Sequence, residues 1–585
     1  MSDVTLAEDL HRSIVGRIDS ALVDLRSAAE QPPQPPSLLE PDAEVWVDPD
    51  AGDDANTGHD QRSAFRSLSR ATKALKPRSR LMLASGHYRD RLELKDLGTS
   101  ADRPIWIKAA TAGAATLSNV AEDLAEGRAD WKHDGGGLYS TPFPARPWAG
   151  FAAGRFLFSY KSLSDLKAAA VAGFGKPPYG LAYQDGRLFL RMPEGADPNG
   201  QPVMVTRDYG APTVRIRRSP HVILDGIAVT GAGNSYAIDA DEQSHHLWMQ
   251  NVVGDLGRVL VRLPDDSMVR WCQYGYSGLM PWAEETMAMN RSAMAPFGLF
   301  KKYNVYAGGN AHYEGRIATS FDAPSRRCRF EHNLIGPCGD GSCIGRFTDS
   351  TSYREVVIFA IDDGTELESY LLSHDSADLR VIEMLVLNAF GSAFSHQDTA
   401  KQIRGPQRLE RCIAYSPHPF GHAAYAIKNM GLQFDPKIEY DRCLLHAKAG
   451  PTGWGRDVNF MFLDHKKGRT PNLSIRNTIL WAEPHITDWD KDWTPDCDYN
   501  VVIADRPYPE LQGPNGLWFS SIEALKLRGP TAEGMDFRPL PGSPLIGAGE
   551  NGVTIGPYDL GEALKHRPMT TAFTDEMPSV WPLAA

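Results

Sequence analysis

Short segments in which apolar and polar residues alternate recur along much of the chain. Each segment turns at an Asn, Asp, Arg or Cys and continues as a second short apolar run. The copies are residues 222–229, 247–253, 268–274, 329–335, 379–385, 409–415, 438–445 and 473–480. Where neighbouring copies are closest they lie roughly 22 to 35 residues apart, the period of one solenoid coil. Because such a unit cannot bury its apolar face alone, its coils must stack. The pattern predicts an all-β solenoid whose flat faces suit an extended polymer.

The two ends of this repeat region carry further motifs. Residues 44–108 read as a strand, a loop rich in Asp and Gly, a short helix from about residue 64 to 75, and two more strands. Residues 535–549 contain Asp-Phe-Arg-Pro-Leu-Pro-Gly-Ser-Pro, and Ile-Gly-Pro-Tyr follows at 555–558. Together these segments resemble the entry and closing segments of the right-handed parallel β-helix (pectin-lyase-like) superfamily. The resemblance implies a right-handed parallel β-helix over residues 44–560. It also implies activity on polysaccharides, because that group includes polysaccharide lyases, polygalacturonase-like hydrolases, epimerases and tailspikes.

The remaining segments do not follow the repeat of the solenoid coils. Residues 4–30 carry a leucine and isoleucine stripe with helical spacing, and prolines at 32–36 end it. We therefore expect an amphipathic helix and linker at 1–36, which packs on its own chain or joins copies into a homo-oligomer. Two further stretches, about 120–215 and 276–325, are expected to be loop insertions, the first with a hairpin at an Asp-Gly turn near residue 185. Residues 561–585 are expected to form a C-terminal tail.

The charge of the chain limits the classes of polymer that it is expected to bind. The formal net charge is −12, which argues against a nucleic-acid groove and makes a strongly anionic polymer a harder ligand. The frequent Gly (53) and Pro (42) suit a turn-rich β architecture.

The seven cysteines are odd in number and show no C-x-x-C spacing, so reduced, buried thiols are expected. No apolar run is long enough for a membrane span, and the N-terminus lacks the pattern of a secretory signal. The location is open: the cytoplasm, or a virus particle or other non-standard export route.

Acidic turns on successive coils are the leading candidates for chemistry. Asp340 lies in a Cys-Gly-Asp-Gly turn, and Asp362 and Asp363 lie about one coil later in an Asp-Asp-Gly turn. Hydrolysis of a glycosidic bond needs a carboxylic acid to protonate the leaving oxygen and a carboxylate to activate water or attack. Crowded carboxylates raise one another's pKa, which would keep one of them protonated. The three residues also resemble the stacked aspartates of polygalacturonase-like hydrolases. The alternative is structural, because Asp-Gly is a frequent turn dipeptide.

Further polar residues are expected beside these turns. Glu366 and Glu368 alternate along a strand and are predicted to extend the site, where they would bind substrate. The next coils bring His396 as a proton carrier, Asp398 and Arg404 as substrate ligands, and Lys428 as a catalytic base. A histidine here could equally be a structural, hydrogen-bonded group.

Three functions stay open at this stage. Hydrolysis by the clustered aspartates is slightly preferred. The close alternative is a lyase, in which Lys428 removes a proton, Arg404 neutralises the substrate carboxylate and the acidic turns hold Ca²⁺. The third is a polysaccharide-binding spike of the phage type, in which the N-terminal helix docks the chain to its particle. No cofactor other than this possible Ca²⁺ is expected.

Overall fold

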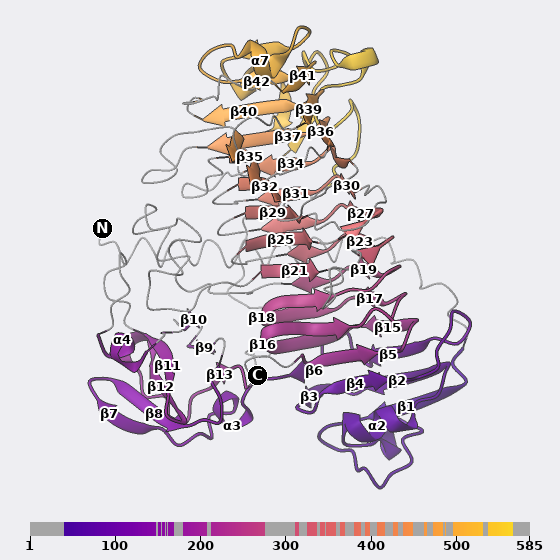
Figure 1. Cartoon of the computed structure of the whole chain (residues 1–585), viewed down its shortest axis with the longest axis vertical. Coiled ribbons are helices and arrows are strands. Elements are labelled where there is room, and N and C mark those ends of the chain that lie inside the picture. Colours follow the sequence, from indigo (N-terminus) through magenta and orange to yellow (C-terminus); the bar gives the residue numbers. More distant parts are fainter. Residues whose placement is uncertain are drawn as a thin grey trace.

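The chain winds into a tall stack of parallel strands (Figure 1). The computed structural model describes residues 40–147, 150–153, 155–157, 160, 162–168, 179–207, 212–274, 310–314, 325–335, 340–345, 347–358, 363–368, 379–387, 392–397, 406–415, 425–430, 437–448, 461–464, 472–483, 486, 495–530 and 536–565. The predicted helix and linker at 1–36 lie outside these residues, as does most of the stretch 276–325.

The first sheet has 13 parallel strands. In order they are β1 (Ala43–Val47), β2 (Ser79–Leu83), β5 (Ile105–Ala109), β15 (Val222–Asp225), β17 (Trp248–Gln250), β19 (Met268–Arg270), β23 (Arg329–Glu331), β27 (Ser350–Tyr353), β30 (Leu379–Ile382), β33 (Gln407–Glu410), β36 (Lys437–Asp441), β39 (Asn472–Arg476) and β41 (Asp496–Asp498). Every one of these strands comes from a different coil, so neighbours in the sheet are far apart in the sequence.

Most of the other parallel strands form a second and a third sheet, which are joined because β16 (Ile227–Ala240) and β18 (Val253–Arg262) run through both. The strands β22 (Ser325–Arg326) and β26 (Phe347–Thr348) form a separate parallel pair. The second sheet also contains β3 (Gly86–Tyr88), β6 (Ala115–Ser118), β20 (Gln273–Tyr274), β24 (Leu334–Ile335), β28 (Val356–Ile358), β31 (Leu385–Leu387), β34 (Ile413–Tyr415), β37 (Leu444–Lys448), β40 (Ile479–Glu483), β42 (Val501–Ile503) and β43 (Leu517–Phe519). The third sheet also contains β4 (Leu92–Lys95), β14 (Val214–Arg217), β21 (Asn310–Glu314), β25 (Asp340–Gly345), β29 (Asp363–Glu368), β32 (Ser392–Gln397), β35 (Tyr425–Met430) and β38 (Met461–Asp464).

From β2 to β38, the described coils visit the three sheets in the same order. For example, β27, β28 and β29 form one coil, and β30, β31 and β32 pair with them strand by strand to form the next. Parallel crossovers of this kind are right-handed in nearly all proteins. The fold is therefore a right-handed parallel β-helix, as the repeats and the end motifs predicted. Inside it, residues such as Leu224, Met249 and Val269 are fully buried and form one continuous apolar core.

The corner between the first and second sheets explains the turn residues of the repeated pattern. At each of these corners from β15 to β42, one residue adopts a positive φ between 51° and 72°. These corner residues are Gly226, Asn251, Trp271, His332, Arg354, Glu383, Arg411, Arg442, Asn477 and Tyr499. Left-handed backbone is unfavourable for most residues other than Gly, Asn and Asp, so the corners are held by their stacked neighbours.

The residue after the corner points inward, and in three coils it is a cysteine. Cys272, Cys412 and Cys443 occupy this position and are buried. Cys328 and Cys497 are also buried, and all five are free thiols. The prediction of reduced, buried cysteines is confirmed for these five; nothing is described for Cys338 and for the side chain of Cys343.

The first coil is closed by the acidic loop and a helix. Helix α2 (Leu68–Ala74) starts at Ser67, whose hydroxyl accepts from the backbone N–H of Arg70. The carboxylate of Asp54 accepts from the backbone N–H groups of Arg66 and Ser67, and Asp48 accepts from those of two following residues. The 3₁₀ turn η1 (Gln61–Ser63) completes the loop. These carboxylates therefore serve as caps for backbone donors.

Residues 120–213 leave the β-helix and form antiparallel structure beside it (Figure 1). One sheet contains β7 (Lys132–Gly135), β8 (Leu138–Pro142), β11 (Gly180–Gln184) and β12 (Arg187–Arg191), and the other β9 (Gly150–Ala152), β10 (Arg155–Phe156) and β13 (Val203–Val205). Helices α3 (Glu122–Ala125) and α4 (Leu163–Ala168) and the turn η2 (Pro193–Gly195) complete the unit. Asp185 and Gly186, both with positive φ, form the turn of the predicted hairpin between β11 and β12. This unit has its own apolar cluster, which includes Trp131, Leu188 and Leu190.

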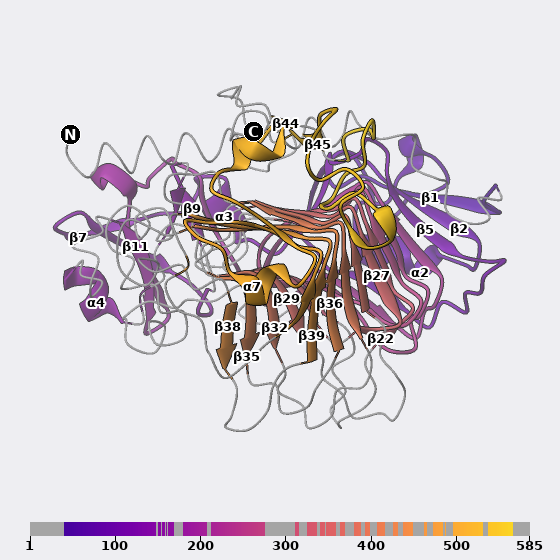
Figure 2. The ribbon, with the colours of Figure 1, turned by 90° about the horizontal axis from the view of Figure 1, so that it is seen from above.

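The C-terminal segment covers the outside of the second sheet, and Figure 2 shows it against the end and side of the stack. It contains α7 (Pro509–Gln512), η5 (Ile522–Leu525), β44 (Leu527–Gly529), β45 (Asp536–Pro539) and η6 (Glu550–Gly552). Phe537, Leu545 and Tyr558 pack in one apolar cluster with outward residues of the second sheet such as Leu444. Within the described part of the chain, no helix has the length and apolar character needed to cross a membrane.

Candidate functional site

The backbone places Asp340 and Asp363 at equivalent points of consecutive coils. Ser342 of β25 pairs with Thr365 of β29. Asp340 and Asp363 each lie two residues before that pair, at the first position of their strands. Both positions therefore lie at the edge where the chain enters the third sheet, one coil apart, and each begins a strand rather than lying in the turn that the sequence predicted. We call this edge the acidic corner.

The next positions of these strands form register columns. Glu366 pairs with Ser395 of β32, and Ser395 pairs with Lys428 of β35. Glu368 pairs with Gln397 two positions further along β29. Glu366 and Lys428 are more than 60 positions apart in the sequence, but their backbone positions are separated by only two strand spacings, roughly 10 Å.

The structure describes backbone positions alone for Asp340, Asp363, Glu366, Glu368 and Lys428. Three other predicted site residues lie outside the described residues: Asp362, Asp398 and Arg404. The roles of all these residues, and Ca²⁺ binding by the acidic turns, stay predictions.

His396 does not fit the role of proton carrier that its sequence position suggested. Its ring is fully buried inside the β-helix. Nδ1 lies 2.6 Å from Gln407 Oε1, and Nε2 lies 2.7 Å from the hydroxyl oxygen of Tyr440. Burial lowers the pKa of His396 to about 4, so the ring is neutral near pH 7. A ring whose two nitrogens are both occupied inside the core is a structural group, which was the alternative that the sequence left open.

The outer face of the first sheet carries two rows of mainly polar and aromatic side chains, which sequence reasoning missed. Along each strand the residues of these rows alternate with fully buried ones, such as Leu409 between Arg408 and Glu410. The first outer row contains Trp106, Ile223, Trp248, Met268, Arg329, Thr351, Arg380, Arg408, Glu439, Ser474 and Asp496. The second contains Lys108, Asp225, Gln250, Arg270, Glu331, Tyr353, Ile382, Glu410, Asp441, Arg476 and Asp498.

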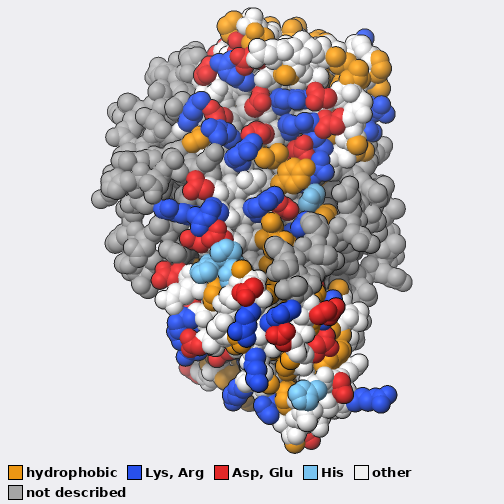
Figure 3. Space-filling view, turned by 90° about the vertical axis from the view of Figure 1, so that its right-hand side faces the viewer, with side chains coloured by type: hydrophobic (Ala, Val, Ile, Leu, Met, Phe, Trp, Pro, Cys, Tyr) orange, Lys and Arg blue, Asp and Glu red, His pale blue; other side chains and the backbone are white. Residues whose placement is uncertain are grey.

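Both signs of charge are mixed along this face (Figure 3). Arg408 Nε donates to Glu439 Oε2 at 2.7 Å, and Arg380 Nη2 donates to Glu410 Oε1 at 2.9 Å, each across neighbouring coils. Near the middle, the guanidinium of Arg270 lies 5.8 Å from the ring centre of Trp248 and 3.5 Å from the carboxylate of Glu331, and both of these charged side chains are buried, whereas Arg380 and Arg408 are partly exposed. Such a strip of charged and aromatic groups can contact both the hydroxyl groups and the C–H faces of a sugar polymer.

Two carboxylates of the second outer row lie on adjacent strands. Glu410 of β33 pairs with Asp441 of β36. Burial raises the pKa of Asp441, the negative charges of Glu410 and Glu550 raise it further, and a hydrogen bond from Asn477 and the charge of Arg442 oppose this. Neighbouring carboxyl groups, one of which holds its proton more tightly, are the kind of pair that acid–base catalysis uses.

Comparison with known proteins adds the following. No protein-family model and no curated protein matches the sequence. Among solved structures, the chain is similar to the complex of XylC with xylose, at 12% identity and a TM-score of 0.49, covering 83% of this chain and 87% of that one. A structure titled glycoside hydrolase gives 10% identity, a TM-score of 0.40 and coverage of 79% and 96%. A structure of a rhamnogalacturonan lyase gives 10% identity and a TM-score of 0.38, and the match covers 89% of this chain and 96% of that one. At these identities and TM-scores the likeness carries no argument about reaction or substrate.

Proposed function

We propose that the chain is a carbohydrate-active enzyme that cleaves glycosidic bonds of a polysaccharide by hydrolysis at the acidic corner. The observation that supports this most is the equivalent placement of Asp340 and Asp363 on β25 and β29. Asp362, directly before Asp363 in the sequence, would complete the set. One carboxylic acid of the set would protonate the leaving oxygen, and a carboxylate would attack the anomeric carbon or activate water.

The neighbouring column would hold the substrate. Glu366 shares its column with Ser395 and Lys428, and Glu368 follows two positions later along the same strand. We expect these residues, with Asp398 and Arg404, to bind hydroxyl or carboxylate groups of the sugars next to the cleaved bond. His396 is not part of this proposal, because its ring is occupied inside the core.

Elimination is the second candidate, and the position of Lys428 favours it. A lyase needs a base near the C5 proton of a uronic acid and a positive group to neutralise its carboxylate. Lys428 would be that base, two coils from Glu366, and Arg404 or a Ca²⁺ ion held by the acidic turns would be the positive group.

The outer face of the first sheet supports two further readings. Glu410 and Asp441 are an alternative catalytic pair for hydrolysis, because the pKa of Asp441 is raised beside a second carboxylate. In the non-catalytic reading, in which the chain is a polysaccharide-binding spike, the two outer rows are the binding surface.

Incubation of the purified chain with a panel of neutral and anionic polysaccharides tests the proposal. Each reaction is assayed for new reducing ends and for the ultraviolet absorbance of unsaturated uronates. Reducing ends without this absorbance support hydrolysis, whereas the absorbance selects elimination and overturns the first choice. Binding to a polysaccharide without either product selects the spike.

A further inference from the structure

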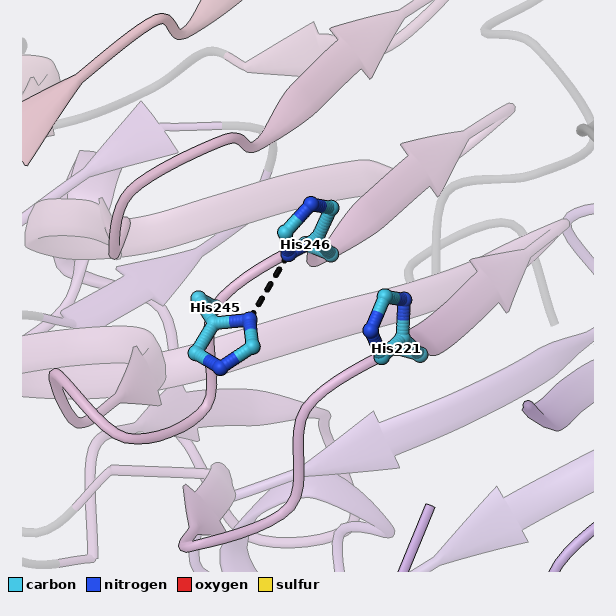
Figure 4. A group of neighbouring side chains, drawn as sticks. All are labelled: His221, His245 and His246. Carbon is cyan, nitrogen blue, oxygen red and sulfur yellow. Dashed lines mark hydrogen bonds between the residues drawn. The ribbon is translucent and has the colours of Figure 1, made fainter. Parts of the chain in front are cut away.

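Three histidine rings gather at the corner that leads into the first sheet (Figure 4). His221 directly precedes β15, and His245 and His246 lie just before β17, one coil later. One ring nitrogen of each histidine lies within 4.8 Å of the others. Among the described residues, these three form the group whose arrangement could hold a metal ion.

The corner brings the rings together through the stacking of coils. His221 and His246 both have positive φ, 53° and 61°, and the backbone N–H of His221 donates to the carbonyl of His245 at 3.0 Å. The rings of His221 and His246 are stacked, with their centres 4.4 Å apart and their planes at 25°. His245 directly precedes His246 in the chain, and the Nδ1 atoms of these two rings are hydrogen-bonded at 2.7 Å.

The close approach of ring nitrogens, rather than the stacking of rings, distinguishes this corner from another corner of the β-helix. At the opposite corner, Trp271 and His332 also stack across coils, at 4.3 Å and 6°, and Tyr353 meets His332 edge to face at 5.5 Å, but the indole nitrogen of Trp271 has no hydrogen-bond partner among the described residues. At the histidine corner a further residue, His245, directs a nitrogen at the stacked pair and meets His221 edge to face at 5.7 Å. We propose that His221, His245 and His246 bind one divalent transition-metal ion, with Zn²⁺ as the best fit.

The geometry is close to what such an ion requires. Zn–N bonds of about 2.0–2.1 Å place the nitrogens of a tetrahedral site roughly 3.4 Å apart. In the cluster the nitrogens are separated by 2.7 Å at one pair and by no more than 4.8 Å at any. Small rotations about the side-chain bonds therefore suffice, and they are easiest for His246, which is exposed. Three imidazoles select Zn²⁺, Cu²⁺ or Ni²⁺ over Ca²⁺ and Mg²⁺, which prefer oxygen.

Charges of both signs surround the cluster. Burial, followed by the rings of His246 and His245, lowers the pKa of His221, and the neutral imidazole is the form that binds metal. The negative charges of Asp102 and Asp266 act on His221, whereas Arg327, which is paired with Asp266, acts on His246 with the opposite sign. Because the ligands come from two coils, the ion would fasten β15 to β17. A fourth coordination position would be open to water or to a ligand.

Metal binding by the full chain without a histidine tag tests this. The protein is freed of metal with a chelator, titrated with Zn²⁺ in a calorimeter, and then assayed for bound zinc after dialysis. We expect one ion per chain and a higher melting temperature with Zn²⁺ than without. Cobalt loading should give the visible absorption bands of a tetrahedral site.

His246→Phe separates metal binding from stacking, because it keeps an aromatic ring against His221 but removes a ligand. We expect this variant and His245→Ala to fold as the parent does without metal and to lose zinc binding. His87→Ala, at an exposed histidine outside the cluster, is the matched control and should bind as the parent does. Equal zinc binding by His245→Ala, His246→Phe and His87→Ala would overturn the proposal, as would a parent chain that binds no zinc.

Discussion

The carboxylate of Glu383 accepts a hydrogen bond from Arg354 Nε at 2.7 Å, between the left-handed corners of two successive coils. The ammonium group of Lys565, from the C-terminal segment, lies 3.3 Å from the same carboxylate. The Glu383 and Lys565 side chains are 8% and 1% exposed, so water screens this contact little. The contact joins the closing segment of the chain to the column of corners.

Replacing this carboxylate should destabilise the stack. We expect Glu383→Gln to lower the free energy of unfolding by about 2–4 kcal/mol, because it leaves the buried charge of Lys565 with less compensation. Denaturant unfolding followed by circular dichroism measures the effect. Glu93→Gln is the matched control: Glu93 pairs with Arg215 at 3.3 Å on the surface, where an ion pair contributes about 0–1 kcal/mol. Equal losses in both variants would contradict the role assigned to Glu383.

The buried ring of His396 predicts a loss of stability in mild acid. Its pKa is about 4 in the folded chain and about 6.5 when unfolded, so between these values the unfolded state binds more protons. Stability from this group is therefore present at pH 7 and decreases as the pH falls from about 6.5 towards 4, by about 2 kcal/mol at pH 5. We expect His396→Gln, which cannot be protonated, to show a smaller difference between unfolding midpoints at pH 7 and pH 5. A difference as large as that of the parent would assign the acid sensitivity to other groups.

The repeats made the fold predictable, because each copy contains both strands and the corner between them. In one copy the turn is marked by Asn251, a residue type that tolerates the left-handed corner. In the next copy the inward position after the corner is marked by the small apolar Cys272, which is buried. His396 shows where the pattern stops: sequence alone could not tell whether it faced inward or outward. Its ring lies inside because it falls two positions after Phe394, which is also fully buried on the same strand.

The outer rows were not predictable, because they depend on the register between coils of unequal length. Glu410 and Asp441 are 31 positions apart and contribute one residue each to a row of the face. No local motif distinguishes them from solvent-exposed residues of an ordinary strand. The histidine cluster has a weak local signal in the pair at 245 and 246, but His221 joins it through the stacking of β15 on β17.

Substitutions at the acidic corner test the catalytic assignment. We expect Asp340→Asn, Asp362→Asn and Asp363→Asn each to lower the rate of polysaccharide cleavage by roughly 100-fold or more, because each removes an acid or base of the reaction. Asp185→Asn, at the left-handed hairpin turn outside the β-helix, is the control and should retain full activity, since Asn tolerates that backbone. Release of reducing ends is the measurement.

The same assay discriminates between the two sets of carboxylates. Full activity in the three corner variants, together with a large loss in Asp441→Asn and Glu410→Gln, would move the catalytic site to the outer face of the first sheet. A loss confined to Lys428→Ala, with unsaturated products from the parent, would select elimination.

If a polysaccharide binds along the outer face of the first sheet, replacing Trp248 should weaken that binding. Its indole Nε1 donates to Gln250 at 3.1 Å, and Arg270 approaches its ring, which fixes the ring within the first outer row. We expect Trp248→Ala to weaken polysaccharide binding about tenfold, because a stacked, cation-supported ring contributes about 1–2 kcal/mol. Trp518→Ala removes a tryptophan that is 37% exposed on the second sheet and should leave binding unchanged. Affinity electrophoresis in gels that contain the polysaccharide measures both variants. If the gel retards the two variants equally, the outer rows do not bind the polymer. The acidic corner then remains as the surface that contacts it.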